Sequence, residues 1–380
     1  MEKIIENKQK NIDQVDEQIT EWDIQAFHRI TSINLSQQQK EDLVQPVSVY
    51  PTQQSVLALH WHPEFIPMDI IVSRIKATFP DMKERLIIPT QHNVLVTLDG
   101  YTGVEVDCFS KAFNQKVQLL LHFKEEKIAK ADSLKSILAH TFKYRTSQLV
   151  EFIDTILNPK YESRLQEAAN KVGANNDLIA FIRIHTNKVK TFLDQNESTI
   201  PPEMIRNKLL TNYFEALNDL YESHYIDQAA RFIRAVKMIV KSYFSTDYFY
   251  RTHEIIEEVR SLGGGIIIPH PEQFWPILLA DYDVDGYEVW NPQSQRYTRF
   301  LIDVVARQNK SRKGKPILIT MGDDCHMGQK LKGHGKQNSE KASREVGVQP
   351  AWEDTEIQHS LDMAKVNRQS LIEEYKNRLN

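Results

Sequence analysis

The sequence predicts an α/β fold in which short buried strands form a parallel barrel. Helix-like segments alternate with short apolar runs, which favours parallel strands joined by right-handed crossovers. Each run ends in a residue that could bind a metal ion or support a ligand, and parallel barrels place their active sites at these C-terminal strand ends. In chain order the seven runs close at His60-Trp61-His62, His92, Glu105, His122, His270, Glu288 and Asp324-Cys325-His326.

Residues 1–54 form a predicted N-terminal helical arm. Its apolar residues, such as Val15 and Ile19, recur at helical spacing among polar ones. We expect this stretch to be an arm or a helix packed on the outside of the barrel. Pro51 then marks the change to the first part of the barrel, residues 55–123.

The first part of the barrel contains short apolar runs of the kind that buried parallel strands show. A helix-like segment, residues 66–78, follows the first run, and residues 93–98 could be a further short strand or an extended loop. We expect strands at residues 55–62, 85–89, 103–107 and 117–122.

Residues 124–251 read as a helical insertion between two barrel strands. The stretch is rich in Lys, Glu, Asn and Leu, and Ile226, Ala230 and Ile233 keep a helical stripe. The insertion therefore divides the barrel into residues 55–123 and a second part, residues 252–328.

The second part of the barrel repeats the order helix, turn, strand. The predicted helix 252–262 stops at Gly263-Gly264-Gly265, because glycine commonly follows a helix end. Residues 329–380 are expected to form a polar loop and a final helix, residues 353–379. We expect the remaining strands at residues 266–268, 286–290 and 316–321.

Composition limits the class of protein. The chain has 380 residues and a net charge of −4, so no global basic field indicates nucleic-acid binding. Only two cysteines are present, which excludes a disulfide framework and fits a reducing compartment. Without a signal peptide or a membrane span, a cytoplasmic location is expected.

The residue pairs at the strand ends suit divalent metal ions. His60 and His62 are two residues apart on a strand, so both imidazoles point to one face, and Asp324 and His326 repeat this spacing. Imidazole nitrogens suit Zn, Fe or Mn, and a carboxylate such as Glu105 can bridge two cations. The candidate ligands are more than one ion needs, so two or three ions per chain are expected: His60, His62, His92, Glu105, His122, His270, Asp324 and His326.

The order of these motifs resembles the PHP (polymerase and histidinol phosphatase) family of metal-dependent phosphoesterases. The resemblance covers roughly residues 55–125 and 252–328. It implies a distorted seven-stranded (β/α)7 TIM-like barrel with a trinuclear metal centre. The matching stretches are Leu59-His60-Trp61-His62, Thr90-Gln91-His92-Asn93, Gly103-Val104-Glu105-Val106, Leu121-His122, Gly264 to Pro271, Gly286 to Asn291 and Gly322 to His326.

The resemblance also implies a role for each ligand. One ion would be held by His60, His62, Glu105 and Asp324. Glu105 would bridge this ion to a second ion, which His122 and His270 would also hold. A third ion would be held by His92 and His326, and the supporting roles would fall to Glu288 and Asn291.

Three departures from the family pattern affect the metal centre. Ala58 stands where the family has Asp two residues before the first His, and Gln91 replaces the Asp of its Thr-Asp-His. The residue that completes the third site has no obvious equivalent after His62, although Asp69 or Glu64 could serve.

The predicted activity is hydrolysis of a phosphomonoester or phosphodiester by a metal-bound hydroxide at the mouth of the barrel. No catalytic residue separate from the metal ligands is predicted. The substrate phosphate would need cations at the rim, and the candidates are Arg312, Lys313, Lys315 and Lys330.

Two other functions remain open. The chain could be a catalytically inactive scaffold or binding module, as the residues at positions 58 and 91 suggest. It could also be a nuclease that acts on single strands. The charge balance favours a small phosphorylated substrate, and no membrane partner is expected.

Overall fold

The structure is a computed structural model that describes residues 15–331 and 339–380. The start of the expected arm (residues 1–14) and part of the expected polar loop (residues 332–338) lie outside the described residues. The chain divides into two compact units. The first unit consists of the segment up to Asn34 and of Lys143–Ser245. The second unit consists of Leu35–Phe142 and Thr246–Asn380.

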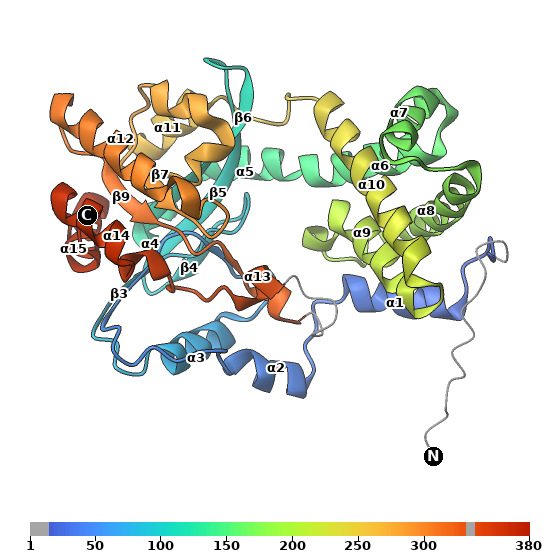
Figure 1. Cartoon of the computed structure of the whole chain (residues 1–380), viewed down its shortest axis with the longest axis horizontal. Helices are drawn as coiled ribbons and strands as arrows, with labels where there is room; N and C mark the ends of the chain where they lie inside the picture. The colour runs from blue at the N-terminus through green and yellow to red at the C-terminus, as the bar shows by residue number, and fades with distance from the viewer. Residues whose placement is uncertain (1–14, 332–338) are drawn as a thin grey trace. The chain divides into compact units, whose positions relative to one another are not determined.

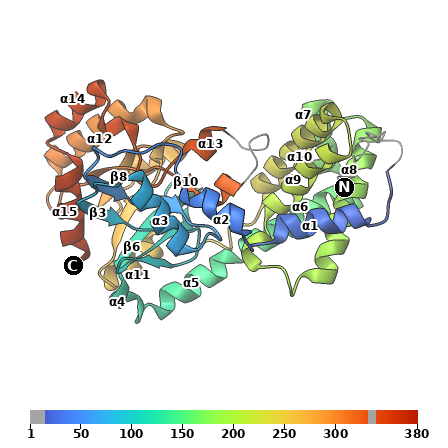
Figure 2. The same cartoon turned by 90° about the horizontal axis from the view of Figure 1, so that it is seen from below.

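The first unit is helical and has its own apolar core. Figure 2 shows α1 among the other helices of this unit. They are α1 (Glu21–Thr31), α6 (Tyr144–Leu157), α7 (Glu162–Val172), α8 (Asn176–Asn196), α9 (Asn207–Ala216) and α10 (Ser223–Tyr243).

The N-terminal segment is shared between the two units. In the helical unit, the ring of Phe27 on α1 stacks on Phe192 and Tyr213, and buried Asp23 accepts a 2.8 Å hydrogen bond from Lys188. The next helix, α2 (Gln37–Val44), instead packs against α3 of the second unit. Residues 1–54 therefore do not form one arm, because the two halves pack into separate cores.

The second unit is a mixed α/β structure. Its largest sheet has the strand order β4-β5-β6-β7-β8-β9, and β1 with β3 and β10 with β2 form two further parallel pairs. The strands are β1 (Ser55–Ala58), β2 (Trp61–His62), β3 (Glu84–Ile87), β4 (Val96–Leu98), β5 (Tyr101–Ser110), β6 (Gln115–Lys124), β7 (Gly265–Ile268), β8 (Gly286–Trp290), β9 (Leu318–Met321) and β10 (Cys325–His326).

Helices surround these strands and bury the aliphatic core between them (Figure 1). α11 contacts β5, α12 contacts β8 and α15 contacts β1. The helical stretch predicted from residue 124 becomes a separate unit only at Lys143, because α5 still packs against α11. The helices of this unit are α2, α3 (Met68–Thr78), α4 (Glu125–Ile128), α5 (Asp132–Phe142), α11 (Thr252–Ser261), α12 (Thr298–Ser311), α13 (Ser339–Ser343), α14 (Thr355–Ala364) and α15 (Arg368–Leu379).

The expectation of an all-parallel sheet is wrong at β6. This strand runs antiparallel to both β5 and β7. Only residues 111–114 separate β5 from β6, whereas a parallel connection needs a crossover of a dozen or more residues. The C-terminal end of β6 therefore lies at the edge of the sheet where β7 begins.

A closed barrel is not found among the described strands, which form three separate sheets. The long final helix predicted over residues 353–379 is also two helices, α14 and α15. Lys365 ends α14 in a left-handed conformation, and the side chain of Asn367 caps the start of α15. Within the described residues, no helix combines the length and the apolar character that crossing a membrane requires.

Candidate metal centre

The chain brings several of the predicted ligands together at the C-terminal ends of parallel strands. His62 lies on β2 and His326 on the neighbouring β10, directly paired in register. The loop after β3 carries His92, which forms a bridge with Glu105 of β5. His270 follows β7 closely, and Asp324 precedes β10. With His60, which directly precedes β2, seven side chains from distant parts of the sequence thus converge.

Backbone hydrogen bonds fix these strand ends to one another. The Asp324 amide donates to the His60 carbonyl at 2.9 Å. The hydroxyl of Thr90 accepts from the Trp61 amide at 3.1 Å, and the Thr90 amide donates to the Trp61 carbonyl at 2.9 Å. The loop that carries His92 is therefore held against the His-Trp-His segment.

The donor atoms of these side chains form three overlapping groups. Within each group, one ligand atom per residue lies within 4.8 Å of the others. The groups are His60, Glu105 and His270; His60, His62 and Asp324; and His62, His92 and His326. His60 and His62 each belong to two groups, but a neutral imidazole has a single free lone pair, so each would bind an ion in only one of them.

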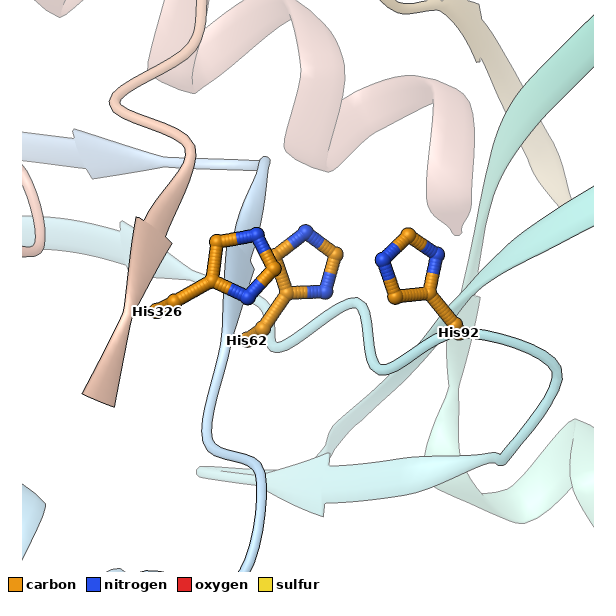
Figure 3. Close-up of side chains that lie close together, drawn as sticks. All are labelled: His62, His92 and His326. Carbon is orange, nitrogen blue, oxygen red and sulfur yellow. The ribbon is translucent and has the colours of Figure 1, made fainter. Parts of the chain in front are cut away.

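The three histidines of the last group lie side by side. Figure 3 shows the ring of His62 between those of His92 and His326. The ring centroids are 4.4 Å apart for His62 and His92 and 4.1 Å apart for His62 and His326, and both pairs are stacked. Three imidazoles at this separation offer nitrogen ligands to one shared cation.

Several buried polar atoms in this cluster lack a hydrogen-bond partner within the described part of the chain. They are both ring nitrogens of His62, Nδ1 of His270 and Nδ1 of His326, whereas Oε2 of Glu105 lies 2.7 Å from Nδ1 of His92. Buried polar atoms are nearly always paired, so each exception needs an explanation. A set of unpaired imidazole nitrogens beside carboxylates fits divalent transition-metal ions, which require such lone pairs.

Glu288 orients one of the histidines. Its Oε2 lies 2.7 Å from Nδ1 of His60, while its Oε1 accepts hydrogen bonds from the His270 amide and from Asn291. A carboxylate beside Nδ1 leaves the opposite nitrogen, Nε2, facing the cluster, and metal-binding histidines are commonly held in this way. The sequence had suggested supporting roles for Glu288 and Asn291, and that assignment stays a prediction.

The surroundings of His60 and His62 shift their pKa values in opposite directions. Burial opposes a charge on His60, but Glu288, Asp324 and Glu105 outweigh it and raise the pKa of His60 to about 10. Burial and the neighbouring rings of His326 and His92 hold the pKa of His62 well below its ordinary value. His62 therefore presents the neutral imidazole that binds metal ions.

The backbone around the cluster adopts unusual conformations. The φ angles are +29° at His270, +45° at Asp324, +52° at Glu64 and +54° at Asn93. Left-handed conformations at residues other than glycine cost of order 1–3 kcal/mol each and concentrate at functional sites. Four of them beside one cluster support a functional role for this region.

His122 does not join the cluster. Its Nε2 lies 3.0 Å from the Leu59 carbonyl and its Nδ1 lies 2.7 Å from the hydroxyl of Tyr375. Because β6 runs antiparallel, His122 pairs with Gly265 at the start of β7, whereas His270 follows the end of that strand. The expected role of His122 as a metal ligand is therefore corrected.

Glu64 and Asp69, the two candidate ligands for a third ion, have different surroundings. Oε1 of Glu64 lies 3.6 Å from Nδ1 of His326, and its side chain is 5% exposed. Asp69 is exposed in the first turn of α3 and belongs to none of the donor groups found in the described residues. Gln91 is buried and accepts a hydrogen bond from the Glu64 amide, and Ala58 lies in an apolar core.

The cations predicted to bind the substrate phosphate lie elsewhere. Residues 312–317 join the end of α12 to the start of β9, at the opposite end of this strand from Asp324. Arg312 and Lys313 line a surface hollow there with Tyr287, and Lys315 belongs to the same connection. The side chain of Lys330 is 6% exposed and donates to two carbonyls and to Glu345. These four residues are therefore not placed around the metal centre.

Two residues near the cluster were missed in the sequence. Arg344 is buried and donates to Oδ2 of Asp324 at 2.8 Å, and Gln293 donates to the same oxygen at 2.6 Å. Neither stands in a recognisable motif. Gln293 follows Asn291 by two residues and could have been noticed, but Arg344 lies in a polar stretch with no pattern of its own.

Comparisons with known proteins give little further information. No protein-family model matches the chain, and no curated protein matches it. Among solved structures, it is similar to a "putative metal-dependent phosphoesterase" from Bifidobacterium adolescentis. The sequence identity is 16% and the TM-score 0.43, over 84% of this chain and 99% of the other. A likeness this distant carries no argument about function.

Proposed function

We propose that this chain is a metal-dependent hydrolase of phosphoesters. The observation that carries the proposal is the convergence of five histidines and two carboxylates from distant segments, with unpaired buried imidazole nitrogens directed at shared positions. Hydrogen bonding inside the protein would satisfy such groups if they were structural. A phosphate ester is the substrate class that a cluster of divalent cations suits best.

The donor groups support two or three ions per chain. One ion would be held by His60, His62 and Asp324, and another by Glu105 and His270. A third would be held by His92 and His326, with Glu64 beside it. Five imidazoles with two or three carboxylates favour Zn, Mn or Fe over Mg or Ca, which prefer oxygen ligands.

Bound divalent ions would supply a water nucleophile at neutral pH and would neutralise the charge on the phosphoryl group. The residues of the chain set the geometry for this chemistry. Glu288 holds Nδ1 of His60, so that Nε2 stays directed at the cluster. His92 is the more accessible histidine, with a 24% exposed side chain, so its side of the cluster offers a route for the substrate.

We further propose that the chain is a distant member of the PHP family with a distorted seven-stranded barrel. The contacts between strands support a ring: β1 pairs with β3, His92 bridges to Glu105 of β5, and the ladder continues from β5 to β9. β10, which follows β9 closely, pairs with β2, which follows β1. An experimental structure with continuous hydrogen bonding around seven segments would test the closure.

A small phosphorylated molecule is the substrate that we favour. The chain has no overall positive charge that would attract a nucleic acid strand. Single-strand cleavage and a purely binding role remain the alternative outcomes. A nuclease would bind single strands with a steep dependence on salt, and an inactive binding module would retain metal ions without turnover.

The test combines metal analysis with a screen of phosphoesters. Purified protein should contain about two or three transition-metal ions per chain, and it should hydrolyse p-nitrophenyl phosphate or its diester. His62→Ala should lose metal and activity, whereas His359→Ala, on the exposed face of α14, should change neither. Less than one bound ion per chain in protein that was offered Zn²⁺ and Mn²⁺ would rule the proposal out.

A further inference from the structure

We propose that Arg344 is a positioning residue that, together with Gln293, turns the carboxylate of Asp324 so that only one oxygen faces the metal centre. The inference rests on the proposed function, because it concerns how Asp324 would bind an ion. It assigns a role to two residues that lie outside the predicted ligand motifs.

The two oxygens of Asp324 have different surroundings. Oδ2 accepts hydrogen bonds from Nε2 of Gln293 at 2.6 Å and from Nη1 of Arg344 at 2.8 Å. Oδ1 instead lies 3.3 Å from Nε2 of His326, 3.6 Å from that of His62 and 3.7 Å from that of His60. Two donors thus occupy one oxygen and leave the other to the imidazole cluster.

Arg344 also holds the backbone of Asp324. Its Nη1 donates to the Asp324 carbonyl at 3.2 Å as well as to the side chain. The Arg344 and Asp324 side chains are only 5% and 9% exposed, so water screens this ion pair little. Contacts to both the main chain and the side chain prevent rotation of the carboxylate and support the left-handed conformation at Asp324.

Arg344 is itself held in place by buried charges. Nζ of Lys330 donates to the Arg344 carbonyl at 2.6 Å and to Glu345 at 2.9 Å. Glu345 also pairs with Arg74, whose Nε lies 2.7 Å from its Oε2. Lys330, expected from the sequence to bind phosphate, therefore fixes the segment that supplies Arg344.

A direct contact between Arg344 and the substrate is the main alternative. The guanidinium already donates to Asp324 through Nη1 and to Glu340 through Nη2 at 3.3 Å. Nε is buried without a partner among the described residues, but a buried guanidinium with both terminal nitrogens engaged suits the support of a metal ligand better than capture of a phosphate from solvent. The two roles predict different measurements: a positioning residue changes the affinity for metal, and a substrate contact changes only KM.

The test measures binding of Zn²⁺ and Co²⁺ alone to metal-free protein, by competition with a chelator and by the visible spectrum of bound Co²⁺. In Arg344→Met we expect one ion to bind about 10–100-fold more weakly, as is typical when a residue that orients a metal ligand is lost. The remaining ions should keep their affinity. Arg344→Lys, which retains one charged donor, should lie between Arg344→Met and the wild type.

Arg378→Met is the matched control. Arg378 is also a buried arginine, with a 3% exposed side chain, but it pairs with Asp285 before the start of β8, away from the metal centre. Its loss should reduce stability without changing metal affinity. Asp324→Asn gives the reference for the loss of the ligand itself.

The outcomes are distinct. Unchanged metal affinity in Arg344→Met, including a change in KM alone, would overturn the inference. If Arg344→Met does not fold, Arg344→Lys and Gln293→Met decide in the same way: weaker binding of one ion supports the inference and wild-type binding overturns it. Failure of the wild type to bind Zn²⁺ or Co²⁺ would instead mean that the proposed function itself is wrong.

Discussion

His122 provides the sharpest contrast between the motif pattern and the structure. The motif order makes it a ligand, whereas the structure places both of its ring nitrogens in hydrogen bonds. The Leu59 carbonyl can only accept, so Nε2 carries the hydrogen, and Nδ1 accepts from the Tyr375 hydroxyl. No lone pair remains for a metal ion. We therefore predict that His122→Leu binds as many metal ions as the wild type and is less stable.

The size of the destabilisation follows from the two partners that the substitution leaves behind. The Leu59 carbonyl and the Tyr375 hydroxyl would both become unpaired in the core, where each costs about 1–3 kcal/mol. We expect the free energy of unfolding to fall by about 2–6 kcal/mol in sum. Adding Tyr375→Phe removes one of the unpaired groups and should recover about 1–3 kcal/mol.

The assay is urea unfolding of the metal-free variants, followed by metal analysis of the same preparations after loading. His270→Leu is the matched substitution, because His270 is also a buried histidine, 5% exposed, and lies in the cluster. It should lose an ion that His122→Leu keeps. Loss of a bound ion in His122→Leu, with stability unchanged, would refute the reasoning.

Further predictions concern pH, ligand orientation and the rim. Burial lowers the pKa of His122 to about 3, so between pH 3 and the ordinary value of about 6.5 only the unfolded chain takes up a proton at this residue; the stability advantage of the metal-free wild type over His122→Leu should be full at pH 7 and shrink toward pH 3, and a difference in free energy of unfolding that stays the same at both pH values would contradict this. Glu288→Gln weakens the orientation of His60 and should reduce affinity for Zn²⁺ about 10–100-fold in a chelator competition, whereas an unchanged affinity would contradict the role given to Glu288. Arg312→Ala and Lys313→Ala should leave kcat/KM for a phosphoester substrate within about twofold of the wild type, since both residues lie before β9, and a tenfold loss would place the substrate there after all.

The sequence predicts the cluster well where ligands follow parallel strands. His60, His62, His270, Asp324 and His326 come directly at strand ends, and the C-terminal ends of parallel strands share one edge of a sheet. A local apolar run with a ligand after it was therefore sufficient to predict that these side chains meet.

The prediction from the sequence was wrong where it depended on the direction of a strand. The run before His122 looks like the others, but its hairpin connection to β5 reverses it, so its end lies at the opposite edge. The short connection, residues 111–114, was the available signal. The expected parallel barrel failed at the same strand.

Residues that act through tertiary contacts were not predictable from a motif. Arg344 reaches Asp324 from a segment 20 residues later in the chain, and its position depends on buried charges contributed by Lys330 and Arg74. The division of the N-terminal segment has a similar origin. Its helical pattern was visible, but the partners of Phe27 and Asp23 lie more than 100 residues away and leave no local trace.

Anomalous diffraction from a crystal, collected at the absorption edge of the bound metal, tests the central claim most directly. We predict two or three peaks within coordination distance of Nε2 of His62, the carboxylate of Glu105 and Oδ1 of Asp324. An electron-density map of metal-loaded protein with no anomalous peak there, and with these imidazoles hydrogen bonded to the carboxylates instead, would contradict the claim that the cluster is a metal centre.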